Sequence, residues 1–389
     1  TTVYGPAAPK TVATDAAGNI YPGVPGYILK MNPGGQILAT YGSGIAGSSD
    51  EDGTAISKAF VDGFQGLAVD RFGNIVCQGG SRARVRRLNL QTGLLETLAG
   101  MAPGVIGDNG PAIATTLQNN NGDLAVLASG ELLIGDSGHQ IVRKLDGNGN
   151  IATFAKGGQA ARLEGLSPDV FAQSCAIKPD GAGNIYVSDV FNIYRIDPKG
   201  IVNLFAGRKG ENGYSGDGGP ATAALLCQPW DVALDGAGNV FIADTNNNRV
   251  RRVDARTGII TTVAGSGPVN GFEHYEQDGQ GSFSGDGGPA VQACLNTPYG
   301  VAIDSAGNLF IADSGNSRIR KVDTNGIITT FMERTGATGT KLAFDGAGIL
   351  YSVTSLGLFR FDPAGRSTQI AVQWPPGFSG DGGPALQAK

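Results

Sequence analysis

The chain has 389 residues, enough for one large or two ordinary domains, and its 63 glycines follow no collagen-like period. Charged residues make up only 16% and the net charge is −5, which argues against nucleic acid as the main partner, because phosphate binding needs clustered Lys and Arg. No apolar run approaches the roughly 18 residues of a membrane span, and the hydrophobic fraction of 41% argues against disorder.

The segment Gln228–Gly265 is the clearest copy of a unit that repeats along the chain. Its four short apolar runs are rich in β-branched residues or alternate in polarity, which is typical of strands rather than helices. The turns between them, such as Asp235–Asn239, are too short for anything but pairing between neighbouring strands. The segment therefore predicts one four-stranded antiparallel meander. A single sheet of this kind exposes both faces and needs others to cover it.

The unit recurs seven times, marked by a Gly-Asn turn that follows the first strand. The turn position moves from Asp15 to Asp345 in six steps that average 55 residues. Seven such sheets predict an all-β fold, a seven-bladed β-propeller of four-stranded antiparallel blades forming a single domain, without long helices. The predicted blades span residues 9–44, 60–100, 118–157, 171–207, 228–265, 297–334 and 338–374. We expect the termini to close the ring, with the C-terminal segment Phe378–Lys389 docking before the first blade.

The repeats resemble NHL repeats, a β-propeller family, and Pro298–Val322 (PYGVAIDSAGNLFIADSGNSRIRKV) matches that pattern nearly throughout. The linkers with the sequence Ser-Gly-Asp-Gly-Gly-Pro-Ala, at Ser215–Ala221, Ser284–Ala290 and Ser379–Ala385, are similar to those of secreted bacterial NHL-type proteins. The resemblance implies a secreted, extracellular or periplasmic protein. It implies little about activity, because propellers serve as binding modules and as enzymes.

One face of the predicted disc collects the turns between second and third strands, together with the blade-to-blade linkers. A polar pattern, Asp-x-x-Asn-x-Arg, recurs on that face and suggests a ring of groups gripping an anionic or sugar ligand. The alternative is that Asp and Asn cap the turn while Arg pairs with a neighbouring blade, and we favour it because the pattern repeats with the fold. The residues concerned are Asp244, Asn247, Arg249, Asp313, Asn316 and Arg318, with a partial copy at Asp136, His139 and Arg143.

Two kinds of segment are candidates for a divalent ion such as Ca²⁺, although we expect no cofactor. The insertion that contains Glu273, His274 and Asp278 carries metal-ligand residue types, but it fits a solvated acidic loop better. The glycine-rich linkers could bind calcium through their aspartates or cradle an anion, but they fit tight turns that need positive φ. The linker aspartates are Asp217, Asp286 and Asp381.

The cysteines show no metal-binding spacing, so we do not expect a zinc site, and we expect one disulfide or none. They are Cys77, Cys175, Cys227 and Cys294.

Aromatic residues stand where the first strands of the fifth and sixth blades begin. Trp230, Asp231 and Tyr299 occupy these positions, and first strands are innermost in a propeller. An aromatic ring beside a carboxylate suits a sugar or a peptide at the mouth of the central channel, and core packing is the alternative.

These observations predict a non-catalytic, secreted NHL-type propeller that serves as a binding or assembly scaffold for a protein or glycan. No nucleophile constellation emerges, because the chain has only two histidines, His139 and His274, and no Gly-x-Ser-x-Gly motif. One alternative is a metal-dependent lyase or lactonase with its site at the central channel. Another is a structural subunit of an extracellular assembly, joined through outer strands such as Thr1–Gly5.

Overall fold

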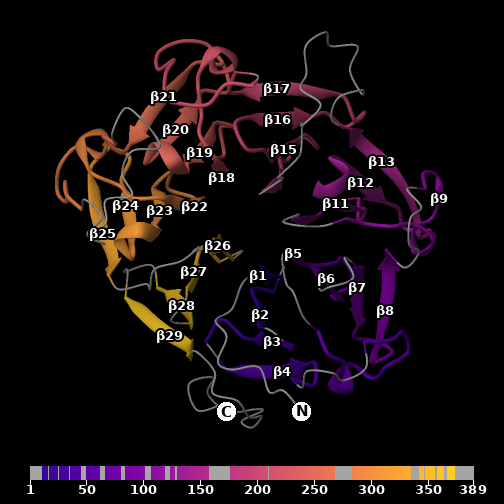
Figure 1. The fold of residues 1–389 in the computed structure, drawn as a ribbon. Helices are drawn as coiled ribbons and strands as arrows, with labels where there is room; N and C mark the ends of the chain where they lie inside the picture. Colours follow the sequence, from indigo (N-terminus) through magenta and orange to yellow (C-terminus); the bar gives the residue numbers. More distant parts are fainter. Residues whose placement is uncertain are drawn as a thin grey trace, which may run out of the picture. The chain divides into compact units, whose positions relative to one another are not determined.

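The computed structural model confirms the predicted fold class, a seven-bladed β-propeller of four-stranded antiparallel blades (Figure 1). It describes residues 11–372 except 16, 25, 35, 45–49, 62–65, 80–83, 101–106, 119–122, 128, 157–175, 209, 268–282, 334–340, 346, 355–356 and 363–365. The chain divides into two compact units, residues 1–154 with 343–389 and residues 155–342. Within the described residues, the helices are single turns of three residues, in agreement with the expectation that long helices are absent.

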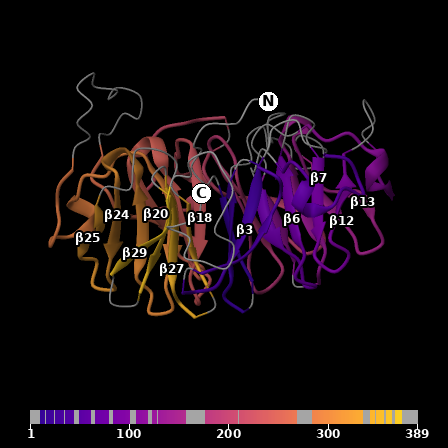
Figure 2. The same ribbon diagram turned by 90° about the horizontal axis from the view of Figure 1, so that it is seen from below.

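Unit 1 holds blades 1, 2, 3 and 7. Blade 1 comprises β1 (Thr11–Thr14), β2 (Ile20–Val24), β3 (Tyr27–Met31) and β4 (Ile37–Tyr41). Blade 2 comprises β5 (Gly66–Val69), β6 (Ile75–Gly79), β7 (Arg84–Asn89) and β8 (Leu94–Ala99). Blade 3 comprises β10 (Leu124–Val126), β11 (Leu132–Asp136), β12 (Ile141–Leu145) and β13 (Asn150–Lys156), with the two-residue β9 (Gly110–Pro111) beside β13. Blade 7 comprises β26 (Lys341–Phe344), β27 (Leu350–Thr354), β28 (Gly357–Phe361) and β29 (Ser367–Val372). The strands β3, β6, β7 and β12 run through the thickness of this unit (Figure 2).

Unit 2 holds blades 4, 5 and 6. Blade 4 comprises β14 (Ile177–Pro179), β15 (Ile185–Ser188), β16 (Ile193–Ile196) and β17 (Val202–Ala206). Blade 5 comprises β18 (Pro229–Leu234), β19 (Val240–Asp244), β20 (Arg249–Val253) and β21 (Ile260–Ala264). Blade 6 comprises β22 (Pro298–Ile303), β23 (Leu309–Asp313), β24 (Arg318–Val322) and β25 (Ile328–Glu333). The short 3₁₀ turns of the two units are η1 (Ile56–Lys58), η2 (Ala112–Ala114), η3 (Ser137–His139), η4 (Ala221–Ala223), η5 (Thr245–Asn247), η6 (Ala290–Gln292) and η7 (Ser314–Asn316).

Where the turn that marks the repeat carries an aspartate, the aspartate holds it. In blade 5, Asp235 Oδ1 accepts hydrogen bonds from the backbone N–H groups of Ala237 and Asn239, both at 2.9 Å. The other carboxylate oxygen accepts from the Asn239 side chain at 2.7 Å, and Gly238 takes φ +80°. The aspartate side chain thus accepts hydrogen bonds from the backbone of its own turn, as in an Asx turn.

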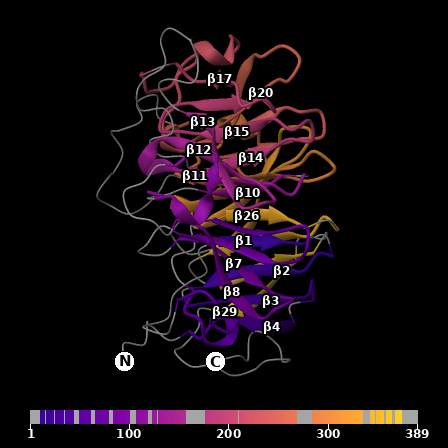
Figure 3. The same cartoon turned by 90° about the vertical axis from the view of Figure 1, so that its right-hand side faces the viewer.

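The core lies between neighbouring blades. In unit 2, Phe241 and Ala243 of blade 5 pack with Val301 and Ile311 of blade 6. In unit 1, Ile20 and Met31 of blade 1 pack with Tyr351 and Leu358 of blade 7, so the first and last blades bury each other's apolar faces. Figure 3 shows β1 and β26 of these two blades next to each other. Ring closure by the C-terminal segment Phe378–Lys389 lies outside the described residues, as does the edge strand predicted at Thr1–Gly5.

The blade-to-blade linkers add a feature that the sequence did not predict. Before blade 5, Gly218 N–H donates to Ile260 O at 2.9 Å and Ile260 N–H donates to Gly219 O at 3.0 Å. The linkers before blades 2, 3 and 6 make corresponding bonds to the β8, β13 and β25 hairpins. A linker therefore pairs with the outermost strand of the blade that follows it and covers part of an edge that would otherwise be open to association.

Candidate functional site

The polar pattern of blade 5 surrounds a fully buried carboxylate. Asp244 lies at the end of β19, where one oxygen accepts from Cys227 N–H at 2.8 Å. Its other oxygen accepts from Asn247 Nδ2 at 2.9 Å and faces Arg251 Nη1 at 3.4 Å. Arg251 is itself fully buried, and its Nη2 donates to the linker carboxylate of Asp217 at 2.6 Å. One arginine therefore joins a strand end to the linker before the blade.

Blade 6 repeats this arrangement with different residues. Asp313 accepts from Asn296 N–H at 2.7 Å and from Asn316 Nδ2 at 2.8 Å. The buried Arg320 lies 3.4 Å from Asp313 and donates to Asp286 at 2.7 Å. The recurrence of these contacts in two blades supports a structural role for the pattern, because a ligand site rarely repeats with every sheet.

The arginine that the pattern itself names has another role. The Arg249 guanidinium lies 3.8 Å from the centroid of the Tyr214 ring, and its Nη2 donates to Ser266 O at 2.7 Å. Arg318 lies at the same distance from the Phe283 ring. Cation–π contacts of this kind hold an aromatic residue of the linker against the blade.

The partial copy in blade 3 contains the one histidine that the structure describes. His139 Nδ1 lies 2.9 Å from Asp136 Oδ2, and Arg143 Nη1 lies 3.9 Å from the same oxygen. Arg143 also lies 3.2 Å from Asp108 in the linker. His139 thus takes the place that Asn247 and Asn316 have in the other two blades. Gln118 N–H donates to the other Asp136 oxygen.

The linker aspartates, considered as calcium ligands, face arginine instead. Asp217 and Asp286 are each bound by a buried guanidinium, that of Arg251 and that of Arg320. Asp381, Glu273, His274 and Asp278 lie outside the described residues. Within the described part of the chain, no group of three or more His, Cys, Asp or Glu residues is placed to hold a metal ion. Cys77, Cys227 and Cys294 are thiols, and Cys175 is outside the described residues.

The two carboxylates of each network differ in pKa because they differ in burial. Burial raises the pKa of both Asp244 and Asp313 to about 6, despite the charge of the neighbouring arginine. Burial also raises the pKa of Asp217, but the hydrogen bond from Thr262, the charge of Arg251 and the bond from Tyr214 outweigh it, so the pKa is lowered. The buried carboxylate of each pair, Asp244 or Asp313, therefore binds a proton more readily than the carboxylate of the linker.

This difference predicts a pH dependence of stability. A carboxyl group whose pKa is higher in the folded than in the unfolded state binds more protons when folded. The free energy of unfolding therefore falls as the pH rises from the unfolded-state pKa to the folded-state pKa. For Asp244 and Asp313 that window runs from 3.8 to about 6. We expect each residue to lower the stability by on the order of 2 kcal/mol between pH 4 and 7. Urea unfolding at several pH values should show a flatter profile for the double variant Asp244→Asn/Asp313→Asn.

The control for that measurement is Asp254→Asn. Backbone and side-chain hydrogen bonds from Thr257 lower the pKa of this partly exposed residue to about 2, from 3.8 in the unfolded chain, so it is ionised in both states above about pH 5. Its replacement should leave the slope between about pH 5 and 7 unchanged. A double variant with the slope of the unmodified protein would contradict the assignment to Asp244 and Asp313.

The aromatic residues predicted at the first strands do come together. The rings of Trp230 on β18 and Tyr299 on β22 lie 5.3 Å apart between centroids and are tilted by 54°. Both residues stand where the pairing register shifts, between Pro229 and Val232 in one blade and between Pro298 and Gly300 in the other. β-Bulges redirect side chains and are frequent next to binding sites. Both side chains remain partly exposed.

Asp231 connects the same strands and brings in a residue that the sequence did not suggest. Its Oδ2 accepts from Val301 N–H of blade 6 at 3.2 Å, and its Oδ1 lies 3.6 Å from the Lys178 ammonium of blade 4. Lys178 was missed because a lone lysine on β14 carries no motif. The aromatic cluster, defined here as Trp230, Tyr299, Asp231 and Lys178, thus draws on the first strands of three blades in unit 2. It combines two rings, a carboxylate and an ammonium group.

Comparison with protein families agrees with the repeat pattern. A family model described as the NHL repeat matches residues 226–253, and one described as the teneurin NHL domain matches residues 269–375. These matches support an NHL-repeat family over residues 226–253 and 269–375. The two matches cover much of blade 5 and blades 6 and 7, which include the copies that resemble the NHL pattern best in sequence.

Curated proteins similar to this chain include teneurin-3 of Mus musculus, 31% identical over 239 residues. The match covers 60% of this chain but only 8% of that protein. Teneurin-4 of Mus musculus is 32% identical over 194 residues, which cover 50% of this chain and 6% of the relative. The chain therefore spans under a tenth of the length of these relatives.

Solved structures of similar fold have different functions. A streptogramin B lyase superposes with a TM-score of 0.57 at 11% identity, covering 92% of this chain and 94% of that one. An auxiliary nutrient binding protein from Bacteroides ovatus gives a TM-score of 0.51 at 15% identity, covering 83% of this chain and 70% of that one. At such identities the likeness concerns the fold alone. No helix among the described residues is long and apolar enough to cross a membrane.

Proposed function

We propose that the chain is a non-catalytic NHL β-propeller that binds a protein or glycan partner through the aromatic cluster on the first strands of blades 4, 5 and 6. The observation that carries this proposal is the tilted contact between Trp230 and Tyr299, two partly exposed rings that two register shifts present side by side. We further propose that the protein acts outside the cytoplasm, as the resemblance of its linkers to those of secreted bacterial NHL-type proteins implies.

The chemistry of the cluster supports binding rather than catalysis. Trp and Tyr offer large apolar area together with a polar edge, and they dominate the energetics of many binding surfaces. Asp231 and Lys178 add hydrogen-bonding groups of both charges on the first strands of the same unit. The contact from Asp231 to Val301 N–H fixes the carboxylate in place, so the cluster is organised before a partner arrives.

The test is binding of the purified chain to a glycan array and to proteins cross-linked in its native medium. We expect Trp230→Ala to weaken binding of the recovered partner at least about tenfold, because removal of a central aromatic anchor costs more than roughly 1.4 kcal/mol. Phe72→Ala is the matched control, since Phe72 is a well-exposed aromatic residue of blade 2. Equal binding by the unmodified chain and by Trp230→Ala/Tyr299→Ala would overturn the proposal.

The same purified protein tests the two alternatives that the sequence left open. Elemental analysis that finds a stoichiometric divalent ion would favour the metal-dependent lyase or lactonase with its site at the central channel. Light scattering that finds a defined oligomer would favour the structural subunit of an extracellular assembly. Neither result is expected if the chain is a monomeric binding module.

A further inference from the structure

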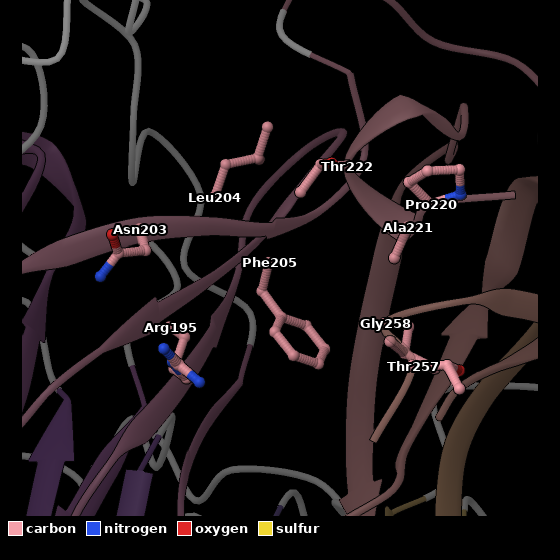
Figure 4. Close-up of a pocket in the computed structure, with 10 residues that line it drawn as sticks. Arg195, Asn203, Leu204, Phe205, Pro220, Ala221, Thr222, Thr257 and Gly258 are labelled. Atoms are coloured by element: carbon pink, nitrogen blue, oxygen red, sulfur yellow. The ribbon is translucent and has the colours of Figure 1, made fainter. Parts of the chain in front are cut away.

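A groove lies between blade 4 and the hairpin of blade 5, away from the aromatic cluster. Its volume is about 310 Å³, at the lower end of the range of small-molecule sites, which is about 300–1,000 Å³. One wall is formed by Arg195 of β16 with Asn203 and Phe205 of β17. The other wall includes Thr222 of η4 and Thr257 of the blade 5 hairpin. Figure 4 shows the Phe205 side chain between the Arg195 side and the Thr257 side of the groove.

The cation in this groove differs from its counterpart in blade 2. Arg195 faces Asn203 across β16 and β17, in the register in which Arg87 faces Glu96 across β7 and β8. In blade 2 the guanidinium is neutralised, because Arg87 Nε and Nη2 both donate to Glu96 Oε2, at 2.8 and 2.5 Å. In blade 4 a neutral amide takes the place of that carboxylate.

Because Asn203 stands where blade 2 has Glu96, the Arg195 guanidinium has no carboxylate opposite it and can accept an anion as a ligand. Among the described residues it forms no ion pair within 4.0 Å. The Tyr186 hydroxyl interacts with the guanidinium, but it is neutral and leaves the charge uncompensated. The neighbouring Arg252 of blade 5, in the corresponding register, pairs with Asp254 at 3.1 Å. That acid also accepts from Thr257 Oγ1 at 2.9 Å, so its charge is held by its own hairpin.

We propose that this groove binds a small carboxylate ligand of the uronic acid class, with the ligand carboxylate on Arg195 in the role that Glu96 has for Arg87. A planar carboxylate accepts two parallel hydrogen bonds from a guanidinium, which explains the preference for this group over a point anion. The Asn203 amide and the hydroxyl of Thr222 suit the hydroxyl groups of a sugar, and Phe205 offers an apolar wall. This site does not rest on the function proposed for the aromatic cluster.

The experiment is isothermal titration of the full chain with D-glucuronate, D-galacturonate and D-glucose. We expect saturable binding of at least one uronate and at least about tenfold weaker binding of glucose, because a charged bidentate contact is lost. Arg195→Gln should weaken uronate binding by at least about tenfold, while Arg87→Gln should not change it. A tri-galacturonate arm distinguishes a free sugar acid from the end of an acidic polysaccharide, which should bind more tightly if the groove takes a chain terminus.

A second variant keeps the proposal testable if Arg195→Gln folds poorly. Asn203→Glu recreates the blade 2 pair, so it should fold with unchanged or raised thermal stability and lose uronate binding, because its own carboxylate occupies Arg195. Trp230→Ala should leave uronate binding unchanged, which separates this site from the aromatic cluster. Uronate binding that survives Asn203→Glu, equal binding of glucose, or no saturable uronate binding would overturn the proposal.

Discussion

Replacing Arg251 by methionine should lower the free energy of unfolding by about 3–5 kcal/mol, the cost of breaking a buried ion pair from one side. The guanidinium is fully buried, contacts Asp217 at 2.6 Å and Asp244 at 3.4 Å, and donates to the carbonyl oxygens of Ser215 and Leu225. Its removal leaves the buried Asp244 carboxylate without a cation and removes the side-chain bonds from β20 to Asp217 and Ser215 of the linker before blade 5. Urea unfolding followed by tryptophan fluorescence measures the loss.

The adjacent Arg252 supplies the control for this prediction. It pairs with Asp254 at 3.1 Å, but both side chains are about one-third exposed, so Arg252→Met should cost less than about 1 kcal/mol. Adding Asp244→Asn to Arg251→Met should recover part of the loss, because the uncompensated charge is then gone. A cost for Arg251→Met no larger than that for Arg252→Met would refute the idea that this arginine locks the linker to the blade.

The repeat is predictable from the sequence because its signals are local. Asp235 and Asn239 bind their own turn, and such turns leave the strands between them no choice of partner except a neighbour. The degenerate copy in blade 7 keeps the turn with Ile349 in place of asparagine, since Asp345 still accepts from Ile349 N–H and takes Tyr351 Oη instead of an amide. The fold therefore tolerates the loss of single signals.

The ion pair between the third-strand arginine and the linker aspartate was missed because it joins residues far apart in the chain. Its signal is nevertheless present in the sequence, since the third strands that carry arginine at this position belong to the blades whose preceding linker carries aspartate. The pairs are Arg86 with Asp52, Arg143 with Asp108, Arg251 with Asp217 and Arg320 with Asp286. The corresponding positions of blades 1, 4 and 7 are Leu29, Tyr194 and Phe359.

The two binding regions differ in how visible they are from the sequence. Trp230 and Tyr299 stand at equivalent positions of neighbouring repeats, so aligning the repeats with one another is enough to bring them together. The groove on blade 4 depends on the absence of an acid opposite Arg195, which only the strand register reveals. A sequence pattern shows which residues are present. Recognising a cation without an acidic partner also requires the positions of the residues around it.

Gly265→Ala should be the other strongly destabilising substitution, with a loss of about 2–4 kcal/mol, because backbone strain and a steric clash combine at this position. Gly265 ends the fourth strand of blade 5 with φ +94°, and a Cβ there would lie 2.3 Å from Asn248 O and 2.9 Å from Arg249 Cα. Both atoms belong to the backbone of the neighbouring strand, so no side-chain rotation relieves the contact. The Gly265 N–H also donates to Ala290 O, which ties the strand end to the next linker.

Gly258→Ala separates the two causes within the same blade. Gly258 has a similarly positive φ of +67°, but no atom lies within 4 Å of the Cβ that alanine would add. This variant should therefore lose only about 1–2 kcal/mol, the cost of a left-handed conformation for a residue with a side chain. Urea unfolding of both variants under one condition gives the difference, which is the cost of the backbone clash. Equal losses would mean that the strand end moves freely to admit a methyl group.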